Sequence, residues 1–196
     1  MAPVRITDLR SRDLRFDLPE GAGSDAVHTD PQYGYAVAVL ETDGPHEGTG
    51  LAFTLGEGTD LVCGAIELLG EELVGRELES LMREFGAVSR SLADHHRLRW
   101  LGPHKGVIHL ALAAITNGCF DLWARNRSLP LWKLLLDLDQ EAFVDLLDLS
   151  YVEGLCTREE AVELLREHEQ SRASRTAILE DGYPAYDTSV GWAAYS

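Results

Sequence analysis

The sequence predicts an α+β fold in which a three-stranded antiparallel meander is followed by a layer of helices. Up to Leu55 the apolar residues alternate with other residues, as in strands that have one covered face. From Thr59 onward they recur at spacings of three and four residues, as in amphipathic helices. The chain has 196 residues, enough to build a core of ordinary size.

The first strand is predicted from alternating apolar residues, namely Val4, Ile6, Leu14, Phe16 and Leu18. Leu9 falls out of this phase, which indicates a bulge near the middle of the strand. Residues 19–31 are rich in glycine, aspartate, serine and threonine and therefore form a long loop. A loop of this length in a compact domain is usually functional or disordered, and the sequence leaves both interpretations open.

Two further strands complete the predicted meander. Tyr33, Tyr35, Val37 and Val39 share one face of the second strand, and Leu51, Phe53 and Leu55 share one face of the third. Residues 43–48 form the turn between them. We expect the helices to cover this apolar face, because antiparallel sheets commonly bury one face and leave the other to solvent.

Thr59 is predicted to cap a helix that stops at Gly75, and a second helix spans residues 78–92. From Val107 to Trp123 the apolar residues lie on nearly every side, which indicates a central helix covered on most faces. A short helix follows at residues 131–136. Residues 141–155 fit a helix or a strand equally well. Thr157 and Glu160 form a capping box that begins the last helix.

The central helix carries a polar stripe with two interpretations. Its members are spaced by multiples of four and are His109, Asn117, Asp121 and Arg125. We favour a structural seam over a site, because an acid and a base one turn apart commonly pair. Gly118 lies in the same helix and is expected to weaken it by about 1 kcal/mol relative to alanine.

Charge and motif searches exclude several classes of protein. The net charge of −16, from 33 acids and 17 bases, argues against a nucleic-acid partner. No apolar run is long enough for a membrane span, and the N-terminus lacks the apolar region of a signal peptide. The three cysteines are widely spaced, as in proteins of a reducing compartment. We therefore expect a cytoplasmic protein. No nucleophile, nucleotide or zinc motif is present, and the paired aspartates at 137 and 139 and at 145 and 148 read as helix caps.

Four stretches together resemble a known family: SDAVHTDPQYGYAVAVLETD, GTGLAFTLGEGTDLV, LRWLGPHKGVIHLALAAITNGCFDLWARNRSLPLWKLLLDL and GYPAYDTSVGWAAYS. They resemble the N-terminal part of L-fuconate dehydratases, in the mandelate racemase branch of the enolase superfamily. DLWA followed by PLWKLL is typical of the superfamily, whereas DAVHTDP and TSVGW resemble the fuconate group more narrowly.

This resemblance implies a capping domain over residues 1–182 and only the first strand of a TIM-type barrel over residues 183–196. In the full-length family, three acids hold a magnesium ion and a lysine acts as the base. Together they bring about the loss of water from a sugar acid. The lysine motif and a barrel of about 200 residues or more are not in this chain. We therefore expect no catalytic residue and no metal ligand here, and no turnover by the chain alone.

The resemblance also implies which residues lie near substrate. The loop at residues 21–33 and the turn at residues 45–51 would close over the barrel mouth. The expected substrate neighbours are His28, Asp30, Tyr33 and Trp192, although Trp192 fits a packing role equally well. A sugar acid would bind only when a barrel is present.

A non-catalytic alternative remains open. The chain could instead act as a binding or assembly module that pairs with a separately encoded barrel, with a full-length homologue or with itself as a homo-oligomer. An unpaired terminal strand and an apolar helical layer without its barrel would both favour association.

Overall fold

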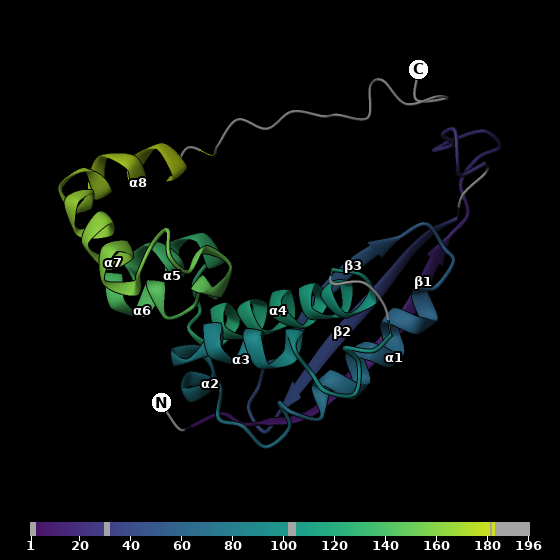
Figure 1. Cartoon of the computed structure of the whole chain (residues 1–196), viewed down its shortest axis with the longest axis horizontal. Coiled ribbons are helices and arrows are strands. Elements are labelled where there is room, and N and C mark those ends of the chain that lie inside the picture. Colours follow the sequence, from purple (N-terminus) through teal and green to yellow (C-terminus); the bar gives the residue numbers. More distant parts are fainter. Residues whose placement is uncertain (1–2, 30–31, 102–104, 181, 183–196) are drawn as a thin grey trace.

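The computed structural model describes residues 3–29, 32–101, 105–180 and 182, and within them the predicted α+β fold is confirmed. Three antiparallel strands lie in the order β1, β2, β3, and the helices follow them in the chain (Figure 1). The strands are β1 (Ile6–Phe16), β2 (Tyr33–Thr42) and β3 (Gly48–Thr54). The helices are α1 (Thr59–Gly70), α2 (Leu78–Arg83), α3 (Phe85–Ala93), α4 (Val107–Asn126), α5 (Leu131–Asp137), α6 (Gln140–Val144), α7 (Arg158–Glu167) and α8 (Arg172–Glu180).

The bulge in β1 lies at its start, not near its middle as predicted. Ile6 is opposite Thr42 and Asp8 is opposite Glu41, so Thr7 is the extra residue. The extra residue reverses the alternation, which brings Leu9 onto the same buried face as Ile6. Leu9 is therefore in phase with the core after all.

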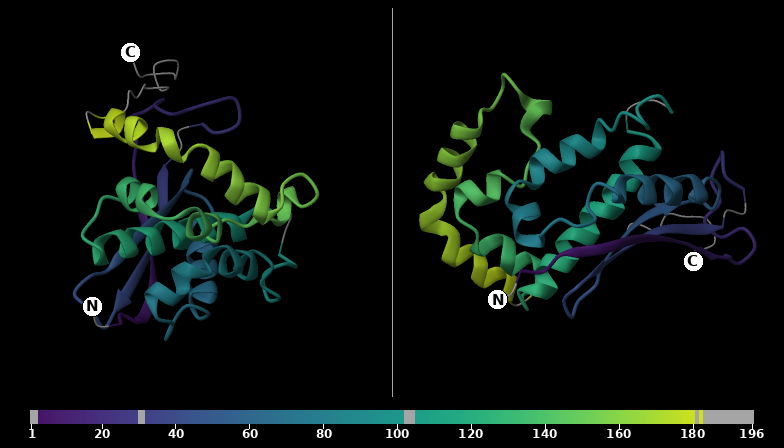
Figure 2. Two further views of the ribbon diagram at one scale, coloured as in Figure 1. Left: turned by 90° about the vertical axis from the view of Figure 1, so that its left-hand side faces the viewer. Right: turned by 90° about the horizontal axis from the view of Figure 1, so that it is seen from below.

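The helices cover the face of the sheet opposite to the one predicted. Helices α1 and α4 lie on one side of the sheet (Figure 2), where they pack on small residues and a few aliphatic ones. The register of the strands puts the aromatic residues of β2 and β3 on the other face. The reason is steric. A Cβ on Gly50 would lie 2.1 Å from the Ala114 carbonyl oxygen of α4, and one on Gly48 would lie 2.3 Å from the Gly118 carbonyl oxygen. Only glycine allows this close approach of helix and strand.

Helix α4 is the central core helix that the sequence predicts. Ala111, Ala114, Ile115, Cys119 and Leu122 on it are fully buried. It is also the one helix among the described residues that is long and apolar enough to cross a membrane by length and composition, a test that core helices also pass. Its contacts with β3, β2, α1 and α3 make it part of a folded core.

The polar stripe on α4 is partly a structural seam, as we favoured. Asp121 accepts a hydrogen bond from the backbone N–H of Thr49 at 2.9 Å and pairs with Arg125. His109 accepts one from the backbone N–H of Lys105 at 3.1 Å. Asn117 is exposed.

Several predicted helix boundaries are wrong. Helix α1 ends at Gly70, not at Gly75, and the predicted last helix is divided into α7 and α8. Residues 78–92 form two helices, since Glu84 leaves helical geometry and the N–H of Gly86 binds the carbonyl of Asp145 at 3.0 Å. Gly58, not Thr59, is the N-cap of α1, and its backbone is left-handed. The predicted capping box of Thr157 and Glu160 is confirmed at the start of α7.

Candidate functional site

A hollow of about 770 Å³ opens at one end of the sheet. Two connections that leave this end line it: the loop between β1 and β2, through His28 and Thr29, and residues 55–58 between β3 and α1. Val107 and Leu110 at the start of α4 form its apolar wall. A volume of this order matches small-molecule sites in proteins, which span about 300–1,000 Å³.

Asp25 holds the part of the loop that carries His28. Its Oδ1 accepts hydrogen bonds from the backbone N–H groups of His28 at 2.7 Å and Val27 at 2.8 Å. The His28 ring lies 3.2 Å from the same carboxylate. These donors, the His28 N–H first, lower the pKa of Asp25 to about 2. The aspartate is therefore ionised at neutral pH, and it positions His28 at the hollow.

The opposite side of the hollow is built by a compact turn. The hydroxyls of Thr54 and Thr59 are 2.7 Å apart, and the Thr59 hydroxyl donates to the carbonyl of Gly56 at 3.2 Å. Thr59 is fully buried, so this bond satisfies its polar group. A Cβ on Gly34 would lie 2.4 Å from the Thr54 hydroxyl oxygen, so β2 needs glycine beside this pair. Residues 55–58 are thus held against the sheet.

The structure separates the predicted substrate neighbours. His28 lines the hollow. Tyr33 lies on the outer face of the sheet, where its ring packs edge-on against Phe53 with centroids 4.9 Å apart. Asp30, Trp192 and the predicted barrel strand at residues 183–196 lie outside the described residues. Substrate contact by these four residues stays a prediction.

The turn at residues 45–51 cannot share a site with the loop at residues 21–33. In an antiparallel meander, the β1–β2 connection and the β2–β3 turn lie at opposite ends of the sheet, and the register of the strands places these two segments so. The expectation that both close over one mouth is therefore wrong. Residues 55–58 take the place of the turn.

Sequence reasoning missed Arg15 and Glu57, which also line the hollow. Arg15 pairs with Asp13 at 2.7 Å, and its hydrogen bond lowers the pKa of that carboxyl group. The order of the strands could have identified both Arg15 and Glu57 as neighbours of the site. The C-terminal ends of the first and third strands of a meander must lie together, and glycines at 56 and 58 mark the tight turn that follows β3.

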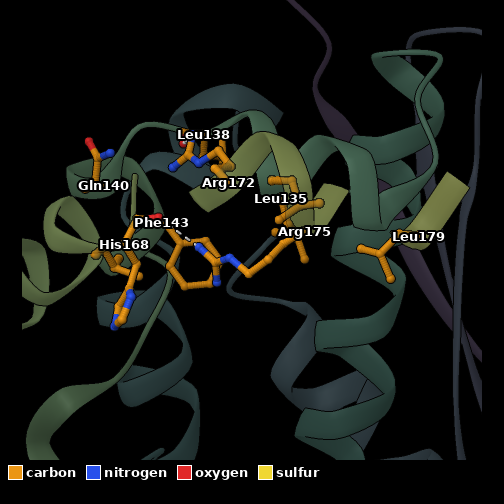
Figure 3. Close-up of a pocket in the computed structure, with 10 residues that line it drawn as sticks. Leu135, Leu138, Gln140, Phe143, His168, Arg172, Arg175 and Leu179 are labelled. Carbon is orange, nitrogen blue, oxygen red and sulfur yellow. Dashed lines mark hydrogen bonds between the residues drawn. The ribbon is translucent and has the colours of Figure 1, made fainter. Parts of the chain in front are cut away.

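A second pocket lies between α5, α6, α7 and α8 and has apolar walls (Figure 3). Both arginines that line it bind groups of this chain. Arg172 donates to the carbonyl of Leu138 at 3.3 Å and pairs with Glu169, and Arg175 donates to the carbonyl of His168 at 3.0 Å. Its volume of about 190 Å³ is below the usual range for ligand sites. We interpret it as a gap in helix packing.

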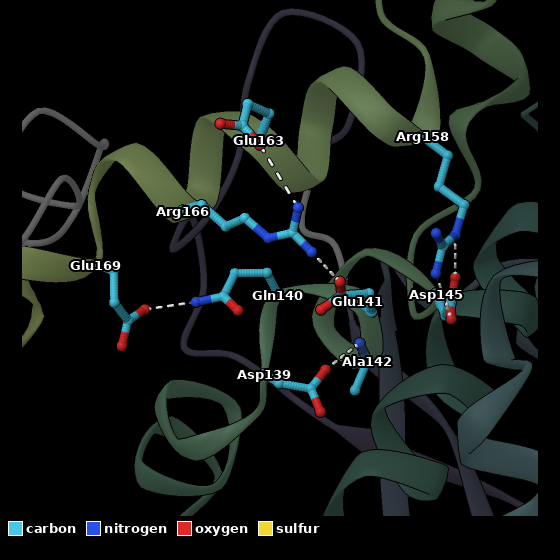
Figure 4. A network of polar contacts seen from close by, with 9 residues as sticks. All are labelled: Asp139, Gln140, Glu141, Ala142, Asp145, Arg158, Glu163, Arg166 and Glu169. Atoms are coloured by element: carbon cyan, nitrogen blue, oxygen red, sulfur yellow. Dashed lines mark hydrogen bonds and ion pairs between the residues drawn. The ribbon is translucent and has the colours of Figure 1, made fainter.

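The described acids do not form a magnesium site. Among the described residues no three histidine, cysteine or acidic side chains converge in a way that could hold a metal. The aspartates singled out in the sequence have other roles. Asp139 caps α6 through the N–H of Ala142 at 2.7 Å, and Asp145 pairs with Arg158 at 2.7 Å (Figure 4). Hard oxygen ligands for Mg²⁺ would have to come from elsewhere.

Comparison with known proteins identifies the class of protein to which this fold belongs. No protein-family model matches the chain. A crystal structure of human mitochondrial enolase superfamily member 1 superposes with a TM-score of 0.90 at 41% identity, over 99% of this chain and 45% of that chain. The fold is that of an enolase-superfamily N-terminal capping domain, and the chain belongs to this superfamily.

Among individual proteins, the chain is similar to an L-galactonate dehydratase of Hypocrea jecorina, with 43% identity over 198 residues. This match covers all of the chain and 44% of the fungal protein, so the chain spans about half the length of the relatives it matches. An L-talarate dehydratase from Polaromonas, crystallised with Mg and L-glucarate, has a TM-score of 0.52 at 22% identity over 67% of this chain and 32% of its own, which shows a shared fold alone.

Proposed function

We propose that this chain is the N-terminal capping part of a magnesium-dependent sugar-acid dehydratase, and that L-fuconate is the substrate of the complete enzyme. The observation that carries the dehydratase role is the match of the entire chain to a protein named L-galactonate dehydratase. The choice of L-fuconate rests on the resemblance of DAVHTDP and TSVGW to L-fuconate dehydratases. The hydrogen on carbon 2 and the hydroxyl on carbon 3 are lost together as one water. The enol that remains tautomerises to a 2-keto acid.

The role of this chain is to shape one side of the substrate site. His28 and the turn at residues 55–58 supply a mixed polar and apolar surface at the hollow, and Asp25 holds His28 there. By the resemblance to L-fuconate dehydratases, a barrel would supply the metal ligands and the base. Among the described residues no three ligating side chains converge on a metal site, and we propose that the chain needs a barrel for turnover.

A chimaeric enzyme tests the proposal. The chain replaces the matched N-terminal part of the Hypocrea jecorina enzyme, and formation of 2-keto acid from L-fuconate and from L-galactonate is measured with Mg²⁺ present. We expect activity in the chimaera, and His28→Ala should change the ratio of kcat/KM for the two acids. A folded chimaera that is inactive on both acids contradicts the capping role.

The chain alone provides the second arm of this test. With Mg²⁺ and either acid we expect no 2-keto acid. Product formation that co-purifies with the 196-residue chain would show that it holds a complete active site, against the proposal.

A separate candidate function is a non-catalytic assembly module that pairs with a separately encoded barrel or with a full-length homologue. Exposed apolar residues on and beside α5 favour it, since Leu129, Leu131 and Trp132 are each more than a third exposed. Mixing the purified chain with the C-terminal part of the fungal relative tests this function. Co-elution of the two polypeptides supports it, and separate elution at high concentration contradicts it.

A further inference from the structure

The outer face of the sheet carries an apolar surface that no described helix covers. Cross-strand pairing puts its residues on one side: Leu14, Phe16, Tyr33, Tyr35, Val37, Val39, Leu51 and Phe53. Val37 and Val39 are buried between their neighbours on the central strand, and the others form the accessible part. Helices α1 and α4 lie on the other side (Figure 2). Phe16, Phe53, Leu14 and Leu51 are between 42% and 53% exposed, an unusual density of half-exposed large apolar side chains for one sheet face.

The aromatic rings at this outer face are ordered in the single chain. Phe16 lies 5.8 Å from Tyr35, and Tyr35 lies 5.5 Å from Phe53, measured between ring centroids. Tyr33 packs on Phe53 from the next row. Because the rings already contact one another, a partner that binds them restricts fewer free side-chain rotamers.

Charge on the outer face points to a second copy of the chain. The face carries two acids, Asp8 and Glu41, and two bases, Arg10 and Arg12, so it is neutral on a chain of net charge −16. Both acids pair with Arg10. Arg12 is exposed and has no carboxylate partner among the described residues. The face is therefore one on which two acidic chains can meet without net repulsion.

The size of the face sets the strength of such a contact. From Asp8 to Phe16, at about 3.3 Å per residue, and across three strands about 4.8 Å apart, the face measures roughly 30 by 14 Å. That projected area of roughly 400 Å² is about half of the roughly 800 Å² per partner that standard interfaces bury, and it falls in the range of weak, transient contacts. A weak dimer that forms at high protein concentration is therefore expected.

We propose that two copies of this chain associate through their outer sheet faces, as two stacked sheets, with the aromatic cluster and Arg12 at the contact. Sheets that pack face to face lie about 10 Å apart and interdigitate side chains such as these. The inference does not depend on the proposed dehydratase role, since the contact needs no bound substrate and of the residues named for it only Phe53 also lines the hollow.

Size-exclusion chromatography with light scattering over a wide concentration range tests the dimer. We expect the mass of the chain to rise from the monomer value of 21.6 kDa towards twice that value. Leu51→Glu should remain monomeric at every concentration with an unchanged midpoint of thermal unfolding, because Leu51 is 48% exposed and outside the core. Arg12→Glu should raise the dissociation constant by about tenfold or more, less so in high salt.

Leu155→Glu is the matched control, because Leu155 is 86% exposed and lies away from the sheet between the 3₁₀ turn at Leu149–Val152 and α7. It should dimerise like the unaltered chain. Phe16→Thr keeps a strand-forming residue and provides a second probe should Leu51→Glu fail to fold. A chain that stays monomeric at the highest concentration overturns the proposal, as does a dimer that survives both Leu51→Glu and Phe16→Thr.

Discussion

Asp121 in the C-terminal half of α4 accepts a hydrogen bond from the backbone N–H of Thr49, at 2.9 Å. Thr49 belongs to β3, which is an edge strand of the described sheet. Edge strands present unpaired backbone groups that invite pairing with other chains. A helix side chain thus satisfies a donor on a strand edge and ties the central helix to the sheet.

Replacing Asp121 should cost more than its surface ion pair with Arg125 suggests. We expect Asp121→Ala to lower the free energy of unfolding by about 1–2 kcal/mol, because the Thr49 N–H loses its partner. Asp137→Ala is the matched control, since it removes an i,i+4 pair with Lys133 and should cost about 0.5 kcal/mol or less. Urea unfolding measures the change in the free energy of unfolding of both variants. Equal losses would show that the Thr49 contact contributes nothing.

Two helical glycines should respond in opposite ways to alanine. A Cβ on Gly64 in α1 meets no atom within 4 Å, so Gly64→Ala should stabilise by up to about 1 kcal/mol. A Cβ on Gly118 would lie 2.5 Å from Cδ1 of the buried Leu40, so Gly118→Ala should destabilise by about 1–3 kcal/mol despite the same gain in helix propensity. Chemical denaturation measures both. A stabilised Gly118→Ala variant would support the sequence-based expectation that this glycine only weakens the helix.

Acid should release the loop that carries His28. The folded pKa of Asp25 is depressed to about 2, so its contribution to loop order is present above the ordinary value of 3.8 and is lost as the pH falls through about 2. Amide exchange at Val27 and His28 should therefore increase, relative to the rest of the chain, only in that range. In Asp25→Asn, whose side-chain oxygen still accepts both bonds, this step should vanish. Titration of Asp25 near 3.8 by NMR would contradict the geometry.

The three free cysteines should differ in reactivity towards a thiol reagent. Burial raises the pKa of the Cys119 thiol to about 12, and burial also raises that of Cys63. Cys156 is only partly buried. In the native chain at pH 8 we expect one fast-reacting thiol and two that react only on unfolding. Cys156→Ser should remove the fast phase. Fast labelling that persists in this variant would place Cys63 or Cys119 at the surface.

Part of the candidate site was predictable from the sequence. The unusual length of the β1–β2 loop and the resemblance around DAVHTDP singled out His28, which does line the hollow. Residues 55–58 were missed because only the pairing of strands shows which connections share an end of the sheet. Tyr33 was grouped with His28 because they are near in sequence, but strand alternation turns its side chain to the outer face.

The sequence by itself determined the fold class, the central helix and the capping box, because hydrophobic period and cap residues act within a few positions of the chain. Only the tertiary structure decided which sheet face is buried. The aromatic face is more hydrophobic, yet the helices lie on the opposite face, where Gly48 and Gly50 let the backbone of α4 approach. Packing selects shape complementarity as well as hydrophobicity, and that complementarity exists only once strand and helix are brought together.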